Sequence, residues 1–259
     1  MPSLQGVGVL VTRPEQQALP LCRLLAAEGA TGYRFPAIDI VPLPHRQDAL
    51  RQLGPVERFD VIIFVSSNAV RFGAALLQQK RDLTIAAVGP ATARALNQAG
   101  YRVAITPADG FDSEGLLAHP QLQCLAGRRV LLLKGAGGRE LLASQLSERG
   151  AIVASVDVYE RRPAAVGEAV LAELELKLDG GVVQVITATS LEIGGHLLAM
   201  ATPRLLRGFD RVHWLVPGER VAEGLRSRGL RAPLLQAASA ADHDLLAALV
   251  RWRASVSGA

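Results

Sequence analysis

The sequence contains little of what marks several common classes of protein. Its two cysteines, Cys22 and Cys124, are too few among 259 residues for a disulfide framework, so a reduced, cytoplasmic compartment is expected. The N-terminus lacks a basic stretch followed by a long apolar run, so no signal peptide is expected. Apolar runs such as 61–65 are much shorter than the roughly 20 residues that span a bilayer. We therefore expect neither a secreted disulfide-rich protein nor a membrane protein.

Aromatic residues and dense positive charge are scarce as well. Aromatic side chains make up 4% of the sequence, and 28 Lys+Arg against 24 Asp+Glu leave a net charge of +4. Arginine supplies most of this positive charge, because Lys80, Lys134 and Lys177 are the only lysines. Surfaces that bind nucleic acid combine clustered charge with aromatic platforms for the bases. We therefore expect no nucleic-acid partner, while the small positive excess permits an anionic ligand.

Motifs for metals and common cofactors are missing. The histidines are scattered, and neither HxxxH nor CxxC spacing occurs. The glycines of 135–138 do not form a dinucleotide-binding G-x-G-x-x-G, because Glu140 stands where the third glycine belongs. No phosphate-binding GxxxxGK[ST] loop and no GxSxG nucleophile elbow is present. The sequence predicts no metal, no cofactor and no hydrolase triad.

What the chain has in quantity is apolar sequence arranged for an α/β fold. Hydrophobic residues make up 49% and charged residues 20%, a globular composition. Short, continuously apolar runs alternate with longer amphipathic segments, which favours parallel sheets covered by helices on both faces. The predicted strands are 7–11, 61–65, 85–88, 130–133, 182–186, 212–216 and 233–236. Helices are predicted over 14–28, from 66, over 90–99 and up to Gly150.

Two pairs of segments repeat within the chain. Segment 7–30 resembles 130–151, with the helix-ending Gly29 and Gly150 in register. Segment 88–100 resembles 217–229, and the strand end 63–67 matches 186–190. The order is therefore A–B–A′–B′, in which A is a βαβ unit and B is a longer run of strands and helices.

The repeats suggest two domains of mixed origin. Segments 36–45 and 156–163 are extended and strand-like, as expected where a chain crosses between domains. We predict a discontinuous α/β domain (1–36 plus 165–259), an inserted continuous α/β domain (41–158), and a two-strand connector (37–40 and 159–164). The alternative is one domain with about ten strands in a single sheet.

Chemistry-bearing residues gather just after the predicted strands. Open α/β sheets bind ligands at the carboxyl ends of their strands, where helix N-termini and hydroxyls offer donors to an anion. The candidates are small, hydroxyl-bearing or basic: Arg13, Ser66, Ser67, Asn68, Gly89, Thr92, Lys134, Gly135, Gly137, Arg139, Thr189, Ser190, Gly218 and Arg220. Any single Ser, Thr or Asn could be an ordinary helix cap. Six such groups in register, several beside Arg or Lys, favour an anion-binding site.

The motifs, taken in order, resemble the uroporphyrinogen-III synthase family. They are LVTRP (10–14), SSNAV (66–70), AAVGPATARAL (86–96), SEGLL (113–117), KGAGGRELL (134–142), VYERRP (158–163), ITATS (186–190), VPGERVAEGLRSRG (216–229) and DHDLLAAL (242–249). Each motif is loose, but their order and spacing cover nearly the whole chain. One departure is at 218–220, where some members have a threonine pair and this chain has Gly218-Glu219-Arg220.

The resemblance implies both a fold and an activity. It implies two three-layer α/β/α domains of the flavodoxin-like, doubly wound type, a two-stranded connector, and an active site in the interdomain cleft. It implies a monomeric lyase that cyclises the linear tetrapyrrole hydroxymethylbilane to uroporphyrinogen III, with ring D inverted and water lost, without cofactor or metal. The eight substrate carboxylates would pair with Arg13, Lys134, Arg139 and Arg220. Tyr159 matches the family's connector tyrosine and is expected to assist loss of hydroxide.

A non-catalytic interpretation stays open at this stage. Two-domain modules that bind or sense small anions also have crossed connectors and a cleft. The two interpretations differ in the product: a synthase converts hydroxymethylbilane to the type III isomer, whereas a binding module leaves the spontaneous type I product unchanged.

Overall fold

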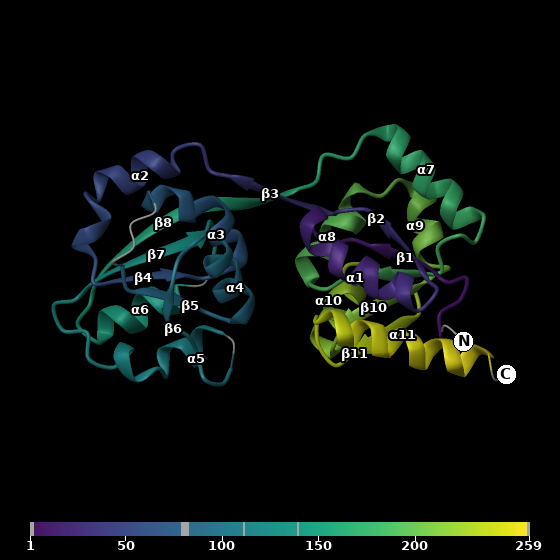
Figure 1. Cartoon of the computed structure of the whole chain (residues 1–259). Helices are drawn as coiled ribbons and strands as arrows, with labels where there is room; N and C mark the ends of the chain where they lie inside the picture. The colour runs from purple at the N-terminus through teal and green to yellow at the C-terminus, as the bar shows by residue number, and fades with distance from the viewer. Residues whose placement is uncertain (1–2, 79–82, 111, 139, 258–259) are drawn as a thin grey trace. The chain divides into compact units, whose positions relative to one another are not determined.

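The computed structural model describes residues 3–78, 83–110, 112–138 and 140–257. The chain divides into two compact units, which we call unit 1 (Met1–Asp39 with Arg162–Ala259) and unit 2 (Ile40–Arg161). In Figure 1, unit 1 therefore combines the purple N-terminal part of the chain with its green and yellow C-terminal part. Within the described residues, no helix is long and apolar enough to cross a membrane.

Each unit is built on its own sheet. The strands are β1 (Gly8–Val11), β2 (Thr31–Arg34), β3 (Ile38–Pro42), β4 (Val61–Phe64), β5 (Ile85–Ala87), β6 (Val103–Ile105), β7 (Arg129–Gly135), β8 (Ile152–Pro163), β9 (Val185–Thr187), β10 (His213–Pro217) and β11 (Leu234–Ala237). The sheet of unit 1 has the order β11-β10-β9-β1-β2, and the other sheet has the order β3-β8-β7-β4-β5-β6. The alternative of a single large sheet is therefore wrong.

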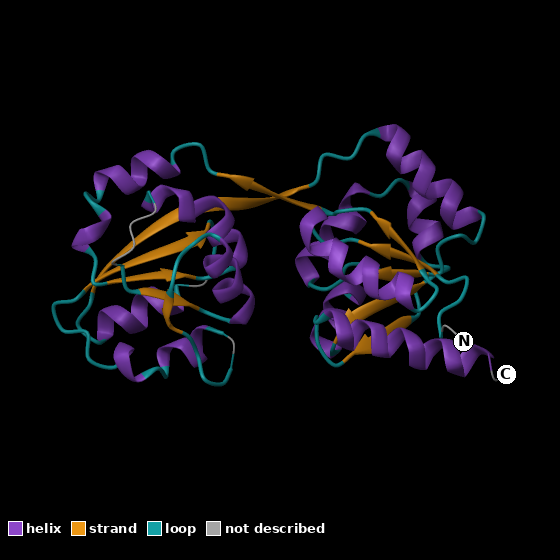
Figure 2. Cartoon of the chain, viewed as in Figure 1, coloured by secondary structure: helices purple, strands orange, loops and turns teal. Residues whose placement is uncertain are grey.

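Helices cover both faces of each sheet (Figure 2). They are α1 (Glu15–Ala27), α2 (Arg46–Gln52), α3 (Ser67–Gly73), α4 (Pro90–Gln98), α5 (Ser113–Leu117), α6 (Leu141–Glu148), α7 (Glu168–Asp179), α8 (Leu191–Met200), α9 (Pro203–Phe209), α10 (Glu219–Arg226) and α11 (Asp242–Ser257). Short 3₁₀ helices lie at Val56–Arg58, Ala74–Leu77 and Pro120–Leu122. The arrangement is a mixed α/β fold with parallel sheets.

The apolar strands serve two cores at once. In β4, Ile62 and Phe64 pack into one buried cluster, whereas Val61 and Ile63 pack into another on the opposite face. Successive side chains of a strand point to opposite faces. Both faces are covered, so each needs apolar residues, and a continuous apolar run is the result.

The repeated segments occupy equivalent places in the two sheets. Beginning at β2, unit 1 has the order β2-β1-β9-β10-β11, and unit 2 has β8-β7-β4-β5-β6. The A and A′ segments supply β1-β2 and β7-β8, and the B and B′ segments supply β4-β5-β6 and β9-β10-β11. Each unit thus combines an A segment with the B segment of the other half, and unit 2 has the connectivity of unit 1 in permuted chain order.

Two strands carry the chain across the division between the units. β3 contains the boundary after Asp39, and β8 contains the boundary after Arg161. Leu43 N donates to Val158 O, and Ala164 N donates to Ala37 O. Ala37, early in the first segment, pairs with Ala164, late in the second, and Leu43 pairs with the earlier Val158. The segments of β3 and β8 therefore run antiparallel.

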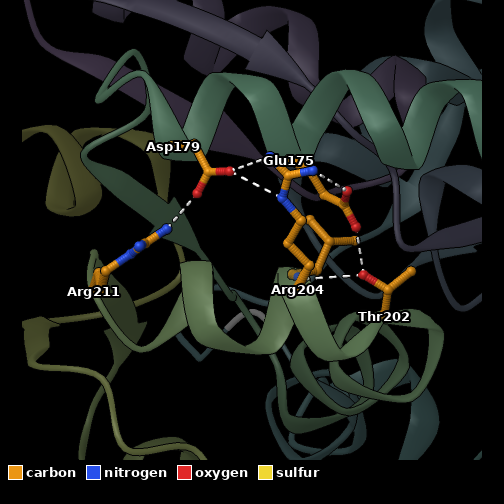
Figure 3. Close-up of polar contacts among 6 residues, drawn as sticks. Glu175, Asp179, Thr202, Arg204 and Arg211 are labelled. Atoms are coloured by element: carbon orange, nitrogen blue, oxygen red, sulfur yellow. Dashed lines mark hydrogen bonds and ion pairs between the residues drawn. The ribbon is translucent and has the colours of Figure 1, made fainter.

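In unit 1, a polar cluster ties α7 to α9 (Figure 3). The Asp179 carboxylate accepts hydrogen bonds from Arg204 and from Arg211 at 2.6 Å each. Both hydrogen bonds lower the pKa of Asp179, and the bond from Arg204 has the larger effect. Glu175 accepts from the hydroxyl of Thr202, which also caps α9. The acidic and basic groups of this cluster satisfy one another, which indicates a structural role.

Candidate functional site

The strand order of unit 2 defines where a ligand would bind. β4, β5 and β6 follow one another toward one edge, whereas β7 returns to the other side of β4 and β8 lies beyond it. The order therefore reverses between β4 and β7. In open α/β sheets, ligands bind outside the carboxyl ends of the strands at such a reversal. In unit 1 the corresponding reversal lies between β1 and β9.

A pocket of about 200 Å³ lies at this reversal in unit 2. Its lining includes Ser66 after β4, Lys134 and Gly135 at the end of β7, and Tyr159 on β8. Four of the residues predicted for the site are thus brought together on neighbouring strands.

Tyr159 is buried, with 2% of its surface exposed. Its phenol oxygen lies 3.2 Å from the Ser66 hydroxyl. Its ring packs near Phe72, with centroids 6.1 Å apart, and the Arg161 guanidinium lies 5.8 Å from the ring centroid. A Cβ added to Gly135 would come within 2.5 Å of the phenol carbon Cζ. The glycine therefore leaves the space that the tyrosine ring fills.

A β-bulge aims this tyrosine. Lys134 is in register with Asp157, but the next residue of β7, Gly135, is in register with Tyr159. Val158 is thus an extra residue in β8, and such bulges re-aim the side chains that follow them. Tyr159 joins the buried cluster that holds Val156 and Val158. Simple alternation would have placed it on the opposite face, with Asp157.

Ser66 has two contacts at its hydroxyl. It stands in extended conformation just before α3 and accepts a hydrogen bond from Ala69 N at 3.1 Å, as an N-cap does. The same oxygen contacts Tyr159. Ser66 therefore joins the start of α3 to the phenol.

Lys134 contributes a nearly buried cation. Its Nζ lies 3.1 Å from Asp157 and 3.4 Å from Glu140. Burial alone would lower the pKa of the Lys134 ammonium, but the hydrogen bonds and charges of Asp157 and Glu140 outweigh it and raise that pKa. Lys134 is consequently charged at neutral pH and does not serve as a proton acceptor.

The other candidates of unit 2 lie around this edge of the sheet. Ser67 is exposed, Asn68 is half-buried and Thr92 is buried in the first turn of α4. Gly89 precedes α4 as its N-cap, and Gly137 has a φ of +69°, which favours glycine. Arg139 lies outside the described residues.

Unit 1 has its own set of predicted site residues, at the ends of β1, β9 and β10. Arg13 forms an ion pair with Asp242 and donates to the carbonyl of Ala240. Ser190 caps α8 by accepting from Ile193 N at 3.2 Å, and Thr189 beside it is half-buried.

Segment 218–220 is where the sequence departs from the family pattern, and the structure shows the contacts of its three residues. Gly218 has a φ of +75° and precedes α10, and Arg220 is exposed. Glu219 accepts from Gln236 and lies 3.4 Å from Arg226. Its carboxylate is thus engaged by neighbours within unit 1.

The pocket also contains three polar or charged residues that were not predicted for the site, namely Ser113, Glu140 and Arg161. A signal existed for Arg161, because it follows Tyr159 by two residues in an extended segment and so shares its face. The position of Glu140, six residues after Lys134, did not predict that the two side chains would pair.

Comparison with known sequences gives a consistent result. The family model described as "Uroporphyrinogen-III synthase HemD" matches residues 20–246. The uroporphyrinogen-III synthase of Escherichia coli strain K12 is 32% identical over 254 residues, covering 93% of this chain and 98% of that protein. The enzyme of the same name from Salmonella typhimurium is also 32% identical, over 252 residues and with the same coverage.

Solved structures share the fold. Uroporphyrinogen-III synthetase from Helicobacter pylori 26695 superposes with a TM-score of 0.64 at 16% identity, covering 96% of this chain and 99% of that one. A mutant uroporphyrinogen III synthase from Thermus thermophilus superposes with a TM-score of 0.56 at 22% identity, covering 98% and 100%. With the family model matching most of its length and relatives above 30% identity, the chain belongs to the uroporphyrinogen-III synthase family.

Proposed function

We propose that the pocket of unit 2 is part of the active site with which this chain, a lyase of tetrapyrrole biosynthesis, converts hydroxymethylbilane to uroporphyrinogen III. The observation that carries the proposal is the meeting of Ser66, Lys134, Gly135 and Tyr159 at the strand reversal of unit 2 in a chain of this family.

The reaction sets the tasks of these residues. The C–O bond of the terminal hydroxymethyl group breaks while the pyrrole nitrogen donates electrons, and the departing hydroxide takes a proton and leaves as water. The substituted carbon of ring D attacks the resulting azafulvene and gives a spiro intermediate. That intermediate fragments and recloses with ring D reversed, and the proton released at the final carbon restores the pyrrole.

Orientation is the main requirement. Without help, hydroxymethylbilane closes at the free position of ring D and gives the type I isomer. The enzyme must therefore hold one folded conformation of a chain that cyclises readily, which is catalysis by positioning.

The contacts in unit 2 suit a division of roles. The Lys134 ammonium would attract a substrate carboxylate, and its pairing with Asp157 and Glu140 holds it in place. Tyr159 carries a phenol hydroxyl at the edge of the same pocket and would protonate the leaving hydroxide. Gly135 would allow close approach of the substrate to the backbone.

The finer architecture belongs to the same proposal. We infer that each unit is a flavodoxin-like, doubly wound domain, because its strands follow the order 2-1-3-4-5 once the permutation of unit 2 is allowed for. β3 and β8 would form the two-stranded connector. We further propose that the substrate is bound by residues from both domains, including Arg13, Thr189, Ser190, Gly218 and Arg220, and that the enzyme acts as a monomer.

The deciding experiment supplies hydroxymethylbilane to the purified full chain and separates the oxidised products by isomer. We expect the type III isomer to predominate, against type I in a protein-free control. If the added protein leaves the type I product unchanged, the chain does not catalyse the inversion and the proposed function is wrong.

A further inference from the structure

The Ser66 hydroxyl stands between two partners that leave it little capacity for substrate. It accepts the backbone N–H of Ala69 at 3.1 Å and contacts the phenol oxygen of Tyr159 at 3.2 Å. A serine hydroxyl has one proton to donate and two lone pairs that accept. With one lone pair occupied by Ala69 N–H, its proton is available to the phenol oxygen.

We propose that Ser66 is a positioning residue for Tyr159, and that it acts by donating a hydrogen bond to the phenol oxygen. The bonds then run in one direction, from Ala69 N–H to the Ser66 oxygen and from the Ser66 O–H to the Tyr159 oxygen. Each group in such a chain polarises the next. The proton of Tyr159 is left free to pass to the hydroxide that leaves the substrate.

The surroundings of the phenol hold its oxygen beside Ser66. Tyr159 is enclosed on the Gly135 side, where even a methyl group would be too close to Cζ. The ring is flanked by Phe72 and by the Arg161 guanidinium. The packed ring fixes the position of the phenol oxygen, and the Ser66 hydroxyl beside it orients the phenol O–H. The bulge at Val158 sets the course of the backbone beneath the ring.

The proposal rests on the proposed function, because it requires Tyr159 to act in the reaction. It differs from a role of Ser66 in binding substrate carboxylates. A binding role predicts that Ser66→Ala raises KM, whereas a positioning role predicts a lower kcat with KM unchanged. We expect kcat to fall about 3- to 10-fold, the rate equivalent of one ordinary hydrogen bond, and Ser66→Thr to restore most of the loss.

A double-mutant cycle separates this role from a general structural one. If Ser66 acts through the Tyr159 hydroxyl, Ser66→Ala has no further effect on kcat in a Tyr159→Phe background. Thr202→Ala is the control, because the Thr202 hydroxyl also has two partners away from the pocket: it caps α9 by accepting from Leu205 N at 3.1 Å and donates to Glu175. It should lower the melting temperature to a similar extent as Ser66→Ala and leave kcat unchanged.

Several results would overturn the inference while leaving the proposed function intact. These are a wild-type kcat in folded Ser66→Ala, a rise confined to KM, or independent effects of the two substitutions in the cycle. A Tyr159→Phe variant with wild-type kcat would overturn it as well. Failure of the wild-type chain to form the type III isomer is a separate outcome and rejects the proposed function itself.

Discussion

At the scale of single residues, the site depends on one extra residue in a strand. Val158 shifts the register between β7 and β8, and as a result Tyr159 shares a face with Val156 and lies in register with Gly135. The resemblance of VYERRP to the family pointed to Tyr159. The direction of its side chain could not be predicted, because alternation along 152–159 assigns it to the opposite face.

Gly135 provides a test of how tightly the phenol is held. In Gly135→Ala the new Cβ would lie 2.5 Å from Cζ of Tyr159, so the ring must move. We expect kcat to fall between about 10- and 100-fold, since small misplacements of reacting groups have effects of this size. We also expect the free energy of unfolding to fall by about 1–3 kcal/mol from overpacking.

Gly167→Ala is the control for this substitution. Gly167 has a φ of −73°, and a Cβ there meets no atom within 4 Å. Gly167→Ala should keep the wild-type kcat and lose only a little thermal stability, because Gly167 is the N-cap of α7 and alanine is a poorer N-cap than glycine. A Gly135→Ala enzyme that keeps full activity would show that the phenol does not need its present position.

Charged partners were the least predictable feature of the site. The sequence assigned Arg13 and Lys134 to substrate carboxylates without indicating their partners within the protein. In the structure Arg13 pairs with Asp242, which lies 229 positions further along the chain, and Lys134 pairs with Asp157 through the register of β7 and β8. Both pairings depend on tertiary structure, which residue type and local spacing do not reveal.

At the scale of elements, α8 and α10 pack closely through two glycines. A Cβ on Gly194 of α8 would lie 2.5 Å from Leu225, and a Cβ on Gly224 of α10 would lie 2.7 Å from Leu191. The surroundings differ, because Leu225 is fully buried whereas Leu191 is half-buried. A half-buried leucine can rotate away more easily than one enclosed by the core.

This difference predicts unequal effects of the same substitution. Replacing glycine by alanine within a helix gains up to about 1 kcal/mol from helix propensity, and overpacking costs about 1–3 kcal/mol. We expect Gly194→Ala to destabilise unit 1 by about 1–2 kcal/mol and Gly224→Ala to be nearly neutral, as measured by chemical denaturation. Equal effects of the two substitutions would contradict this account of the contact.

The elements predicted from sequence were those with strong local signals. The predicted strands with continuous apolar runs correspond to β1, β4, β5, β7, β9, β10 and β11, and the extended segments 36–45 and 156–163 contain β3 and β8. β2 and β6 had no comparable run. Both lie at sheet edges, and β2 has the partly exposed sequence TGYR. Both are short and partly exposed, so their apolar signal is weak, whereas β11, also at an edge, carries two adjacent leucines.

At the scale of the whole molecule, the internal repeats were the best guide to how the chain is divided between two sheets. They paired segment 7–30 with 130–151 and segment 88–100 with 217–229. The first pair forms β1-α1 and β7-α6, and the second forms α4 and α10, which follow the equivalent strands β5 and β10. The repeats, together with the extended segments 36–45 and 156–163, led to the prediction that one domain takes a segment from each half of the chain. Which strands become neighbours in each sheet was not predicted, and the structure pairs β1 with β9 and β4 with β7.

The central claim is that Tyr159, in the pocket of unit 2, protonates the leaving hydroxide and so starts the enzymatic cyclisation. It is tested most directly by the ratio of type III to type I product formed by wild type and by Tyr159→Phe at equal concentrations. The ratio is informative because spontaneous closure to type I competes whenever the enzyme is slow. We predict that Tyr159→Phe keeps the wild-type fold, turns over more slowly and yields a larger fraction of type I. A folded Tyr159→Phe protein with the wild-type rate and isomer ratio would contradict the claim.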